Sequence, residues 1–196
     1  MKIYKISENL KSKMEDWYKQ RTNKHIELVQ KYCRKIIEKF DEYDELKERL
    51  EVHDDSKFEE PEKTPYVFIT WKYKCKEDDM DFEKCNPPED IDDQMYEATI
   101  HHITTNSHHP EFHAPNKDDH HALINKENRD KPPEEMIDAT KMPDMDIAEM
   151  CADWCSVSEE RGNSPKDWAK KNINVRWKFN KHQEDLIYDI LDEIWE

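Results

Sequence analysis

The chain has 196 residues, 40% of them charged, and a formal net charge of −16. A surface this acidic repels phosphate backbones, so the composition argues against a protein that binds nucleic acid generally. Six Trp, eight Tyr and six Phe argue against disorder, and a chain of this length can bury a core as a single domain.

The scarcity of glycine points to an all-α protein. Gly162 is the single glycine, whereas a sheet-rich domain needs glycine in hairpin turns and bulges. The same scarcity excludes the glycine-rich phosphate loops of the Walker and GxGxxG types. A small phosphorylated ligand remains compatible with the acidic chain if a metal supplies local positive charge.

The cysteines and the N-terminal residues bear on the compartment. There are five cysteines, an odd number, and the first residues lack the apolar segment of a signal peptide. No stretch approaches the roughly 18 apolar residues of a membrane span. We therefore expect a reduced, cytoplasmic protein without membrane contact. Cys151 and Cys155 share a helix face, and burial is favoured over a zinc site because no further ligands stand at suitable spacing.

The first part of the chain predicts two helices. The first begins at Ser7, a suitable N-cap, and runs to about residue 20. Its apolar positions are Leu10, Met14, Trp17 and Tyr18. Thr22 or Asn23 can cap the second helix, whose apolar residues recur at spacings of three and four. His25 lies at the edge of that apolar face, so we expect it to point toward the core.

Two further helices carry polar candidates on apolar faces. A short helix contains Leu46 and Leu50, and His53 continues the same face one turn further on. Asp54 follows where we expect the helix to end. A later helix opens at residue 144 and has Asp153 at the edge of its apolar face, with acidic residues one and two turns earlier.

The middle of the chain has a different composition, with nine of the ten prolines between residues 61 and 143. We predict a helix started by Pro65, an acidic loop over 76–93, and a helix from 91 to about 107 that Pro110 would end. Residues 114–142, with His120 and His121, are predicted to form a long surface loop or lid.

The C-terminal part returns to helices. Gly162 is expected to stop the helix that contains Asp153. Ser164 then caps a short helix, and a last helix from about Lys181 buries one apolar face. These helices, over residues 164–196, are expected to pack on the rest of the domain.

The histidines and aspartates form an ordered set of candidate metal ligands. The segment 101–111 (HHITTNSHHPE) contains four of the ten histidines, and imidazole and carboxylate suit Mn, Fe, Co, Ni and Zn. Each element alone has a plainer interpretation: a core histidine, a chance pair or a solvated polar run. Buried together, such groups need partners, and a shared metal would satisfy them. The set is His25, His53, Asp54, His101, His102, His108, His109 and Asp153.

The register of the histidine-rich segment is open. If the helix continues to about His109, then His102 and His109 share a face because they are seven residues apart. His101 and His108 form the alternative pair.

This ordered pattern resembles the HD superfamily of metal-dependent phosphohydrolases. A helical His, a His-Asp pair and a late helical Asp appear in that order. More narrowly, three segments resemble a small bacterial and phage HD family of uncharacterised function. They are HDDSKF (His53–Phe58), NSHHPE (Asn106–Glu111) and EMCADW (Glu149–Trp154). The resemblance covers about residues 20–160 and implies an all-α, HD-like helical bundle with long proline-rich loops.

The resemblance also implies roles for single residues. His25, His53, Asp54 and Asp153 would hold a first divalent metal. Asp54 would bridge to a second, held by His102 and His109, with His108 as the alternative or as a supporting residue. Lys57 would donate a proton or neutralise phosphate charge, and Glu111 would orient a histidine ligand. The metals are expected to be one or two ions of Mn, Fe, Co, Ni, Zn or Mg.

These roles lead to a ranked expectation of function. The first is hydrolysis of a small phosphate ester, such as a nucleotide, by metal-activated hydroxide. The family also contains di-iron oxygenases with the same types of ligand, which is the second reading. A non-catalytic, metal-stabilised interaction protein is the third. No base- or sugar-recognising motif identifies the substrate.

Overall fold

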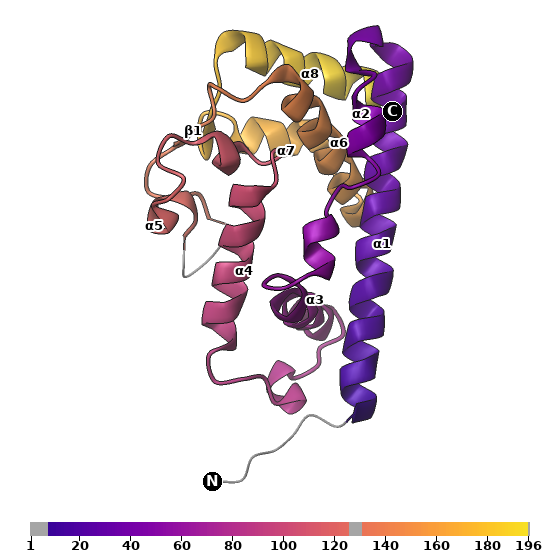
Figure 1. Cartoon of the computed structure of the whole chain (residues 1–196), viewed down its shortest axis with the longest axis vertical. Helices are drawn as coiled ribbons and strands as arrows, with labels where there is room; N and C mark the ends of the chain where they lie inside the picture. Colours follow the sequence, from indigo (N-terminus) through magenta and orange to yellow (C-terminus); the bar gives the residue numbers. More distant parts are fainter. Residues whose placement is uncertain (1–7, 126–130, 196) are drawn as a thin grey trace. The chain divides into compact units, whose positions relative to one another are not determined.

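The computed structural model describes residues 8–125 and 131–195, and its regular structure is almost entirely helical (Figure 1). This confirms the predicted all-α class. The helices are α1 (Glu8–Lys39), α2 (Leu46–Arg49), α3 (Lys63–Glu77), α4 (Ile91–Thr105), α5 (His120–Leu123), α6 (Asp144–Arg161), α7 (Pro165–Asn172) and α8 (Lys181–Ile194). Short 3₁₀ helices are η1 (Asp41–Tyr43), η2 (Asp55–Phe58), η3 (Phe82–Cys85) and η4 (Pro110–His113).

The chain divides into two compact units. Unit 1 comprises residues 1–24 and 54–102, and unit 2 comprises residues 25–53 and 103–196. Both are discontinuous in sequence. The expectation of one domain over the whole chain, with a core at 20–160, stays a prediction.

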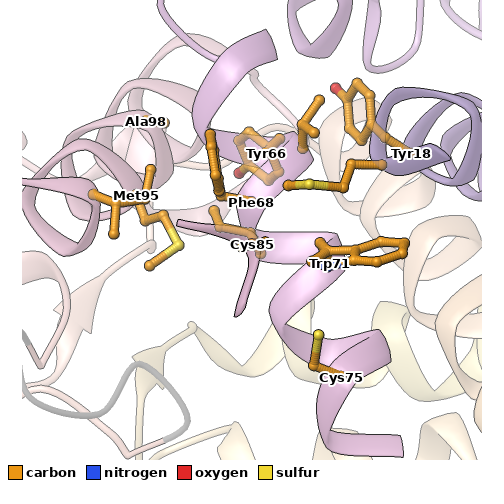
Figure 2. Close-up of a cluster of buried hydrophobic side chains, with 12 residues drawn as sticks. Tyr18, Tyr66, Phe68, Trp71, Cys75, Cys85, Met95 and Ala98 are labelled. Atoms are coloured by element: carbon orange, nitrogen blue, oxygen red, sulfur yellow. The ribbon is translucent and has the colours of Figure 1, made fainter. Parts of the chain in front are cut away.

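Unit 1 is organised around α3. This helix begins just before Pro65, as predicted, and buries residues on several of its faces. Figure 2 shows aromatic side chains of α3 near Tyr18 of α1 and near Met95 and Ala98 of α4. The buried cluster is Met14, Tyr18, Tyr66, Val67, Phe68, Ile69, Trp71, Cys75, Cys85, Ile91, Met95 and Ala98. This core includes α3, the helix that follows η2.

Unit 2 is built on α6, which packs against α7 and α8. The interior of α6 includes Cys151 and Cys155, which are buried free thiols, as expected. In α8 the apolar face is fully buried, and a capping box formed by Asn180 and Gln183 fixes its start. Two strands, β1 (Ile137–Asp138) and β2 (Trp177–Lys178), pair in parallel with Ile137 opposite Trp177.

The predictions made for α1 and for the end of α4 are wrong. The two helices expected before residue 40 are one, since α1 contains neither proline nor glycine and Thr22 is buried within it rather than capping a helix. Ser7, the predicted N-cap, lies outside the described residues. The helix α4 ends at Thr105 and does not reach His109. It is followed by a turn in which the His109 N–H donates to the Asn106 carbonyl, and short polar residues such as Asn and Ser favour turns there.

The segment over 114–142 also differs from the predicted surface loop. Its described parts contain α5 and β1, and several of its apolar side chains are buried. These are Leu123, Ile124, Ile137, Ala139 and Met142. The segment therefore contributes to the interior of unit 2. Its predicted mobility stays a prediction.

The end of α6 and the start of α7 follow the sequence signals. Ser164 accepts a hydrogen bond from the Asp167 N–H at the start of α7. Gly162 ends α6 with a left-handed φ of 64°, and its N–H donates to carbonyl groups of the last turn. Along the described residues, no helix combines the length and apolar character that crossing a membrane requires.

Replacing Gly162 with alanine is expected to destabilise the chain by about 1 kcal/mol. An added Cβ would meet no atom within 4 Å, so the cost comes from the left-handed backbone alone. Urea unfolding followed by circular dichroism measures it. The exposed neighbour Asn163→Ala is the control, and a stability unchanged by Gly162→Ala would refute this account of the helix end.

Candidate metal centre

Each unit contains a buried cluster of histidines and carboxylates. Cluster A, in unit 2, consists of His25, His53, His108, Glu149 and Asp153. Cluster B, in unit 1, consists of Asp54, Lys57, Glu62, His101 and His102. Together the two clusters contain most of the predicted site residues.

In cluster A, α1 and α6 place His25 opposite Asp153. The Nε2 atom of His25 lies 3.1 Å from Oδ1 of Asp153. The Ser156 hydroxyl donates to the Asp153 carbonyl at 2.8 Å and lies 3.1 Å from Nδ1 of His25. Because that hydroxyl proton is already used, we assign Nδ1–H of His25 as the donor to Ser156. The lone pair of Nε2 then faces a carboxylate oxygen.

The other side of cluster A is held by Glu149, one helical turn before Asp153. Its Oε1 atom lies 2.8 Å from Nδ1 of His53 and 3.5 Å from Nδ1 of His108. The ring centroids of His53 and His108 are 4.4 Å apart. Ligand atoms of these three residues lie within 4.8 Å of one another, close enough to hold one ion. Since Nδ1 of His53 is bonded to Glu149, Nε2 is the nitrogen that would bind a metal.

The carboxylates of cluster A are kept ionised by their neighbours. Burial opposes the ionisation of Asp153, but the neighbouring imidazoles of His25, His108 and His53 outweigh it and hold its pKa below the ordinary value. Burial likewise opposes ionisation of Glu149, and His53 and His108 hold its pKa below the usual range. A pair of charged carboxylates among imidazoles is a ligand set for Mn, Fe, Co, Ni or Zn.

A second network supports Glu149 from outside cluster A. Arg49 forms ion pairs with Asp146 and, at 3.3 Å, with Oε2 of Glu149. Asp146 also accepts a hydrogen bond from the Ser107 hydroxyl at 2.9 Å and lies 3.3 Å from Nε2 of His113. These contacts fix the start of α6 and leave Oε1 of Glu149 directed at the histidines.

In cluster B, the backbone at Asp54 turns sharply. Asp54 has a φ of 63° in the left-handed region, which aspartate tolerates better than most residues. The helix that was expected to end at Asp54 is shorter, because α2 ends at Arg49 and a turn over residues 50–54 follows it. The Asp54 side chain is 1% exposed, and its Oδ1 lies 3.3 Å from Nε2 of His102. Its Oδ2 accepts a hydrogen bond from Lys57 Nζ, one turn of η2 later.

Lys57 is held in place by unit 1. The Tyr18 hydroxyl donates to the Lys57 carbonyl, and Nζ of Lys57 lies 5.6 Å from the centre of the Tyr66 ring. Burial raises the pKa of Tyr18, so its hydroxyl remains a donor at neutral pH. The ammonium group lies beside the Asp54 carboxylate. The role that the resemblance implies for Lys57, as a proton donor or phosphate ligand, stays a prediction.

Two further predicted site residues, His109 and Glu111, have positions that differ from the predicted roles or leave them untested. His109 is half-buried just before η4, with its ring centroid 4.4 Å from that of His108. The expectation that it shares a helix face with His102 is wrong because α4 ends earlier. Glu111 accepts a hydrogen bond from the Trp177 indole N–H at 2.8 Å, and its Oε2 has no hydrogen-bond partner among the described residues. Burial raises the pKa of Glu111, and its role toward a histidine stays a prediction.

Sequence reasoning missed Glu62 and did not assign Glu149. Glu149 stands four residues before Asp153, so helical spacing was a usable signal that the two share a face. Glu62 lies in the acidic, proline-containing stretch EEPEK, whose composition predicts an exposed surface segment. Its side chain is 0% exposed, and no local pattern signals that.

Comparison with known proteins gives a family without an assigned activity. Residues 14–194 match the family described as "Family of unknown function (DUF5662)". No curated protein and no solved structure matched the chain. The resemblance to HD phosphohydrolases therefore stays a prediction. Because the match covers nearly the whole chain, this protein belongs to the Family of unknown function (DUF5662).

Proposed function

We propose that this protein is a metal-dependent phosphohydrolase that acts on a nucleotide or another small phosphate ester. One observation carries the proposal: the same arrangement occurs in both clusters. In each, a histidine is hydrogen-bonded through Nδ1 and directs Nε2 at the oxygen of an ionisable carboxyl group, at 3.1 Å for His25 and Asp153 and 3.3 Å for His102 and Asp54.

Two acceptor atoms at this distance require a cation between them, either a proton or a metal ion. Ligand atoms bound about 2.0–2.2 Å from one metal in tetrahedral geometry lie roughly 3.2–3.6 Å apart. The His102–Asp54 distance of 3.3 Å lies within that range, and the His25–Asp153 distance of 3.1 Å lies just below it. We therefore assign one divalent cation to each cluster. In cluster A the ligands are His25 and Asp153 together with His53, whose ring centroid lies 5.8 Å from that of His25. The ligands in cluster B are Asp54 and His102.

Phosphate hydrolysis is the reaction that best suits these residues. A divalent cation bound here would lower the pKa of a water molecule and neutralise charge on a phosphate oxygen. Such local positive charge would draw an anionic substrate to a protein whose net charge is −16. Lys57 is the residue that we assign to the substrate: its ammonium group can turn from Asp54 to a phosphate oxygen, or donate a proton to the leaving group. Glu149 orients His53, so that Nε2 remains the ligand atom.

The test combines elemental analysis of the purified chain with a hydrolysis panel of nucleotides, cyclic dinucleotides and aryl phosphates. We expect about two equivalents of Mn, Fe, Co, Ni, Zn or Mg and turnover of at least one phosphate ester. Turnover should stop on chelation and return when metal is added. Bound iron with oxygen consumption, and no phosphate release, would favour an oxygenase instead. Bound metal with neither phosphate release nor oxygen consumption would identify a non-catalytic protein.

A further inference from the structure

Glu62 contacts two neighbouring histidines with its two oxygens. Oε1 lies 2.7 Å from Nδ1 of His101, and Oε2 lies 2.9 Å from Nδ1 of His102. The Ser56 hydroxyl donates to Oε2 at 3.1 Å. Glu62 is the N-cap residue of α3, and its side chain is fully buried. A single carboxylate thus holds two consecutive rings on α4.

The chemistry of the carboxylate decides which ring nitrogens carry protons. An ionised carboxylate only accepts hydrogen bonds, and a neutral imidazole has one donor and one acceptor nitrogen. When Glu62 is ionised, both rings donate through Nδ1, and Nε2 is the acceptor on each. Burial raises the pKa of Glu62, and the contacts with His101, Ser56 and Lys57 counter that shift. For His102, Nε2 is the atom that lies 3.3 Å from Oδ1 of Asp54.

We infer that Glu62 is a positioning residue that sets the tautomer of His101 and His102 together, and so makes Nε2 of His102 a metal ligand. The inference rests on the metal binding proposed for cluster B. In the other tautomer, Nε2 would carry a proton, and His102 could not bind a cation beside Asp54. Carboxylate partners of this kind typically contribute 10–100-fold to metal affinity.

Glutamine at this position separates positioning from packing. Glu62→Gln keeps the side-chain shape but offers one acceptor and one donor, so it can accept from one ring only. His101 is the easier ring to release because its side chain is 39% exposed, against 5% for His102. We therefore expect about a 10-fold loss of metal affinity at His102 for the glutamine variant, and about 100-fold for Glu62→Ala.

The experiment uses the full chain, treated with chelator, and ¹⁵N NMR of the histidine rings. Signals of His101 and His102 are assigned by substituting each in turn. Wild-type protein should show both rings protonated at Nδ1, whereas Glu62→Gln should show one ring switched to Nε2. Zn²⁺ is then titrated while the His102 ring signals are followed, which reports cluster B alone.

The matched control is Glu60→Gln, the same change at an exposed carboxylate that contacts Thr64. It should leave the ring tautomers and the Zn²⁺ affinity unchanged. His102 protonated at Nε2 in the wild type would overturn the inference. So would wild-type Zn²⁺ affinity in both Glu62 variants, with Glu62→Gln deciding the matter if Glu62→Ala fails to fold. If the Glu62 results hold and no phosphate ester is hydrolysed, the proposed reaction fails and the positioning role stands.

Discussion

Replacing Asp153 with asparagine is expected to remove about one equivalent of metal and to lower hydrolysis by roughly 100-fold or more, since even supporting residues of metal sites contribute 10–100-fold. Asparagine preserves the shape of the side chain, so α6 should still form. It removes the negative charge that lies 3.1 Å from Nε2 of His25. Without that charge, the histidine retains its contact with Ser156 but loses the anionic ligand that completes cluster A.

Asp167→Asn is the control for Asp153→Asn. Asp167 is exposed on α7 of the same unit, and its substitution changes the net charge equally. Elemental analysis and the hydrolysis assay should show a loss for Asp153→Asn and no change for Asp167→Asn. Full metal content in Asp153→Asn would mean that the short contact with His25 is bridged by a proton rather than a metal, and cluster A would then be a structural ion pair.

Periodicity and capping residues predicted most of the helices. The apolar spacing of α6, the stop at Gly162, the cap at Ser164 and the buried face of α8 all appear in the structure. These signals are local, because they depend on residues within two or three turns of one helix. The continuity of α1 was missed because Thr22 resembles a cap by type, although tertiary burial holds it inside a helix.

The candidate site was predictable only in part, because local sequence signals do not show which distant residues meet in the fold. Histidine and aspartate residues stand out in the sequence as one ordered set, so His25, His53 and Asp153 could be proposed together. Buried glutamates do not stand out in a chain with 47 acidic residues. Glu62 and Glu149 are distinguished by burial and by their histidine partners, which depend on chain segments that are distant in sequence. The parallel pairing of β1 and β2 was missed because two-residue strands have no measurable period.

Glu149 is the residue whose loss should damage both stability and metal binding. Its side chain is 7% exposed, and its carboxylate contacts His53, His108 and Arg49. Glu149→Ala removes these charge-assisted contacts at once, while Arg49 keeps its ion pair with Asp146. We expect a loss of about 1.5–3 kcal/mol in the free energy of unfolding, the range for hydrogen bonds to charged groups.

The glutamine variant of Glu149 should separate the two effects. Its amide oxygen can still accept from Nδ1 of His53, so most of the stability should return. The charge shared with His108 and Arg49 does not return, so metal affinity in cluster A should remain about 10-fold weaker. Urea unfolding with chelator present measures the first effect, and Zn²⁺ titration measures the second. Equal metal affinity in wild type and both variants would show that Glu149 supports the fold of α6 and plays no part in orienting His53.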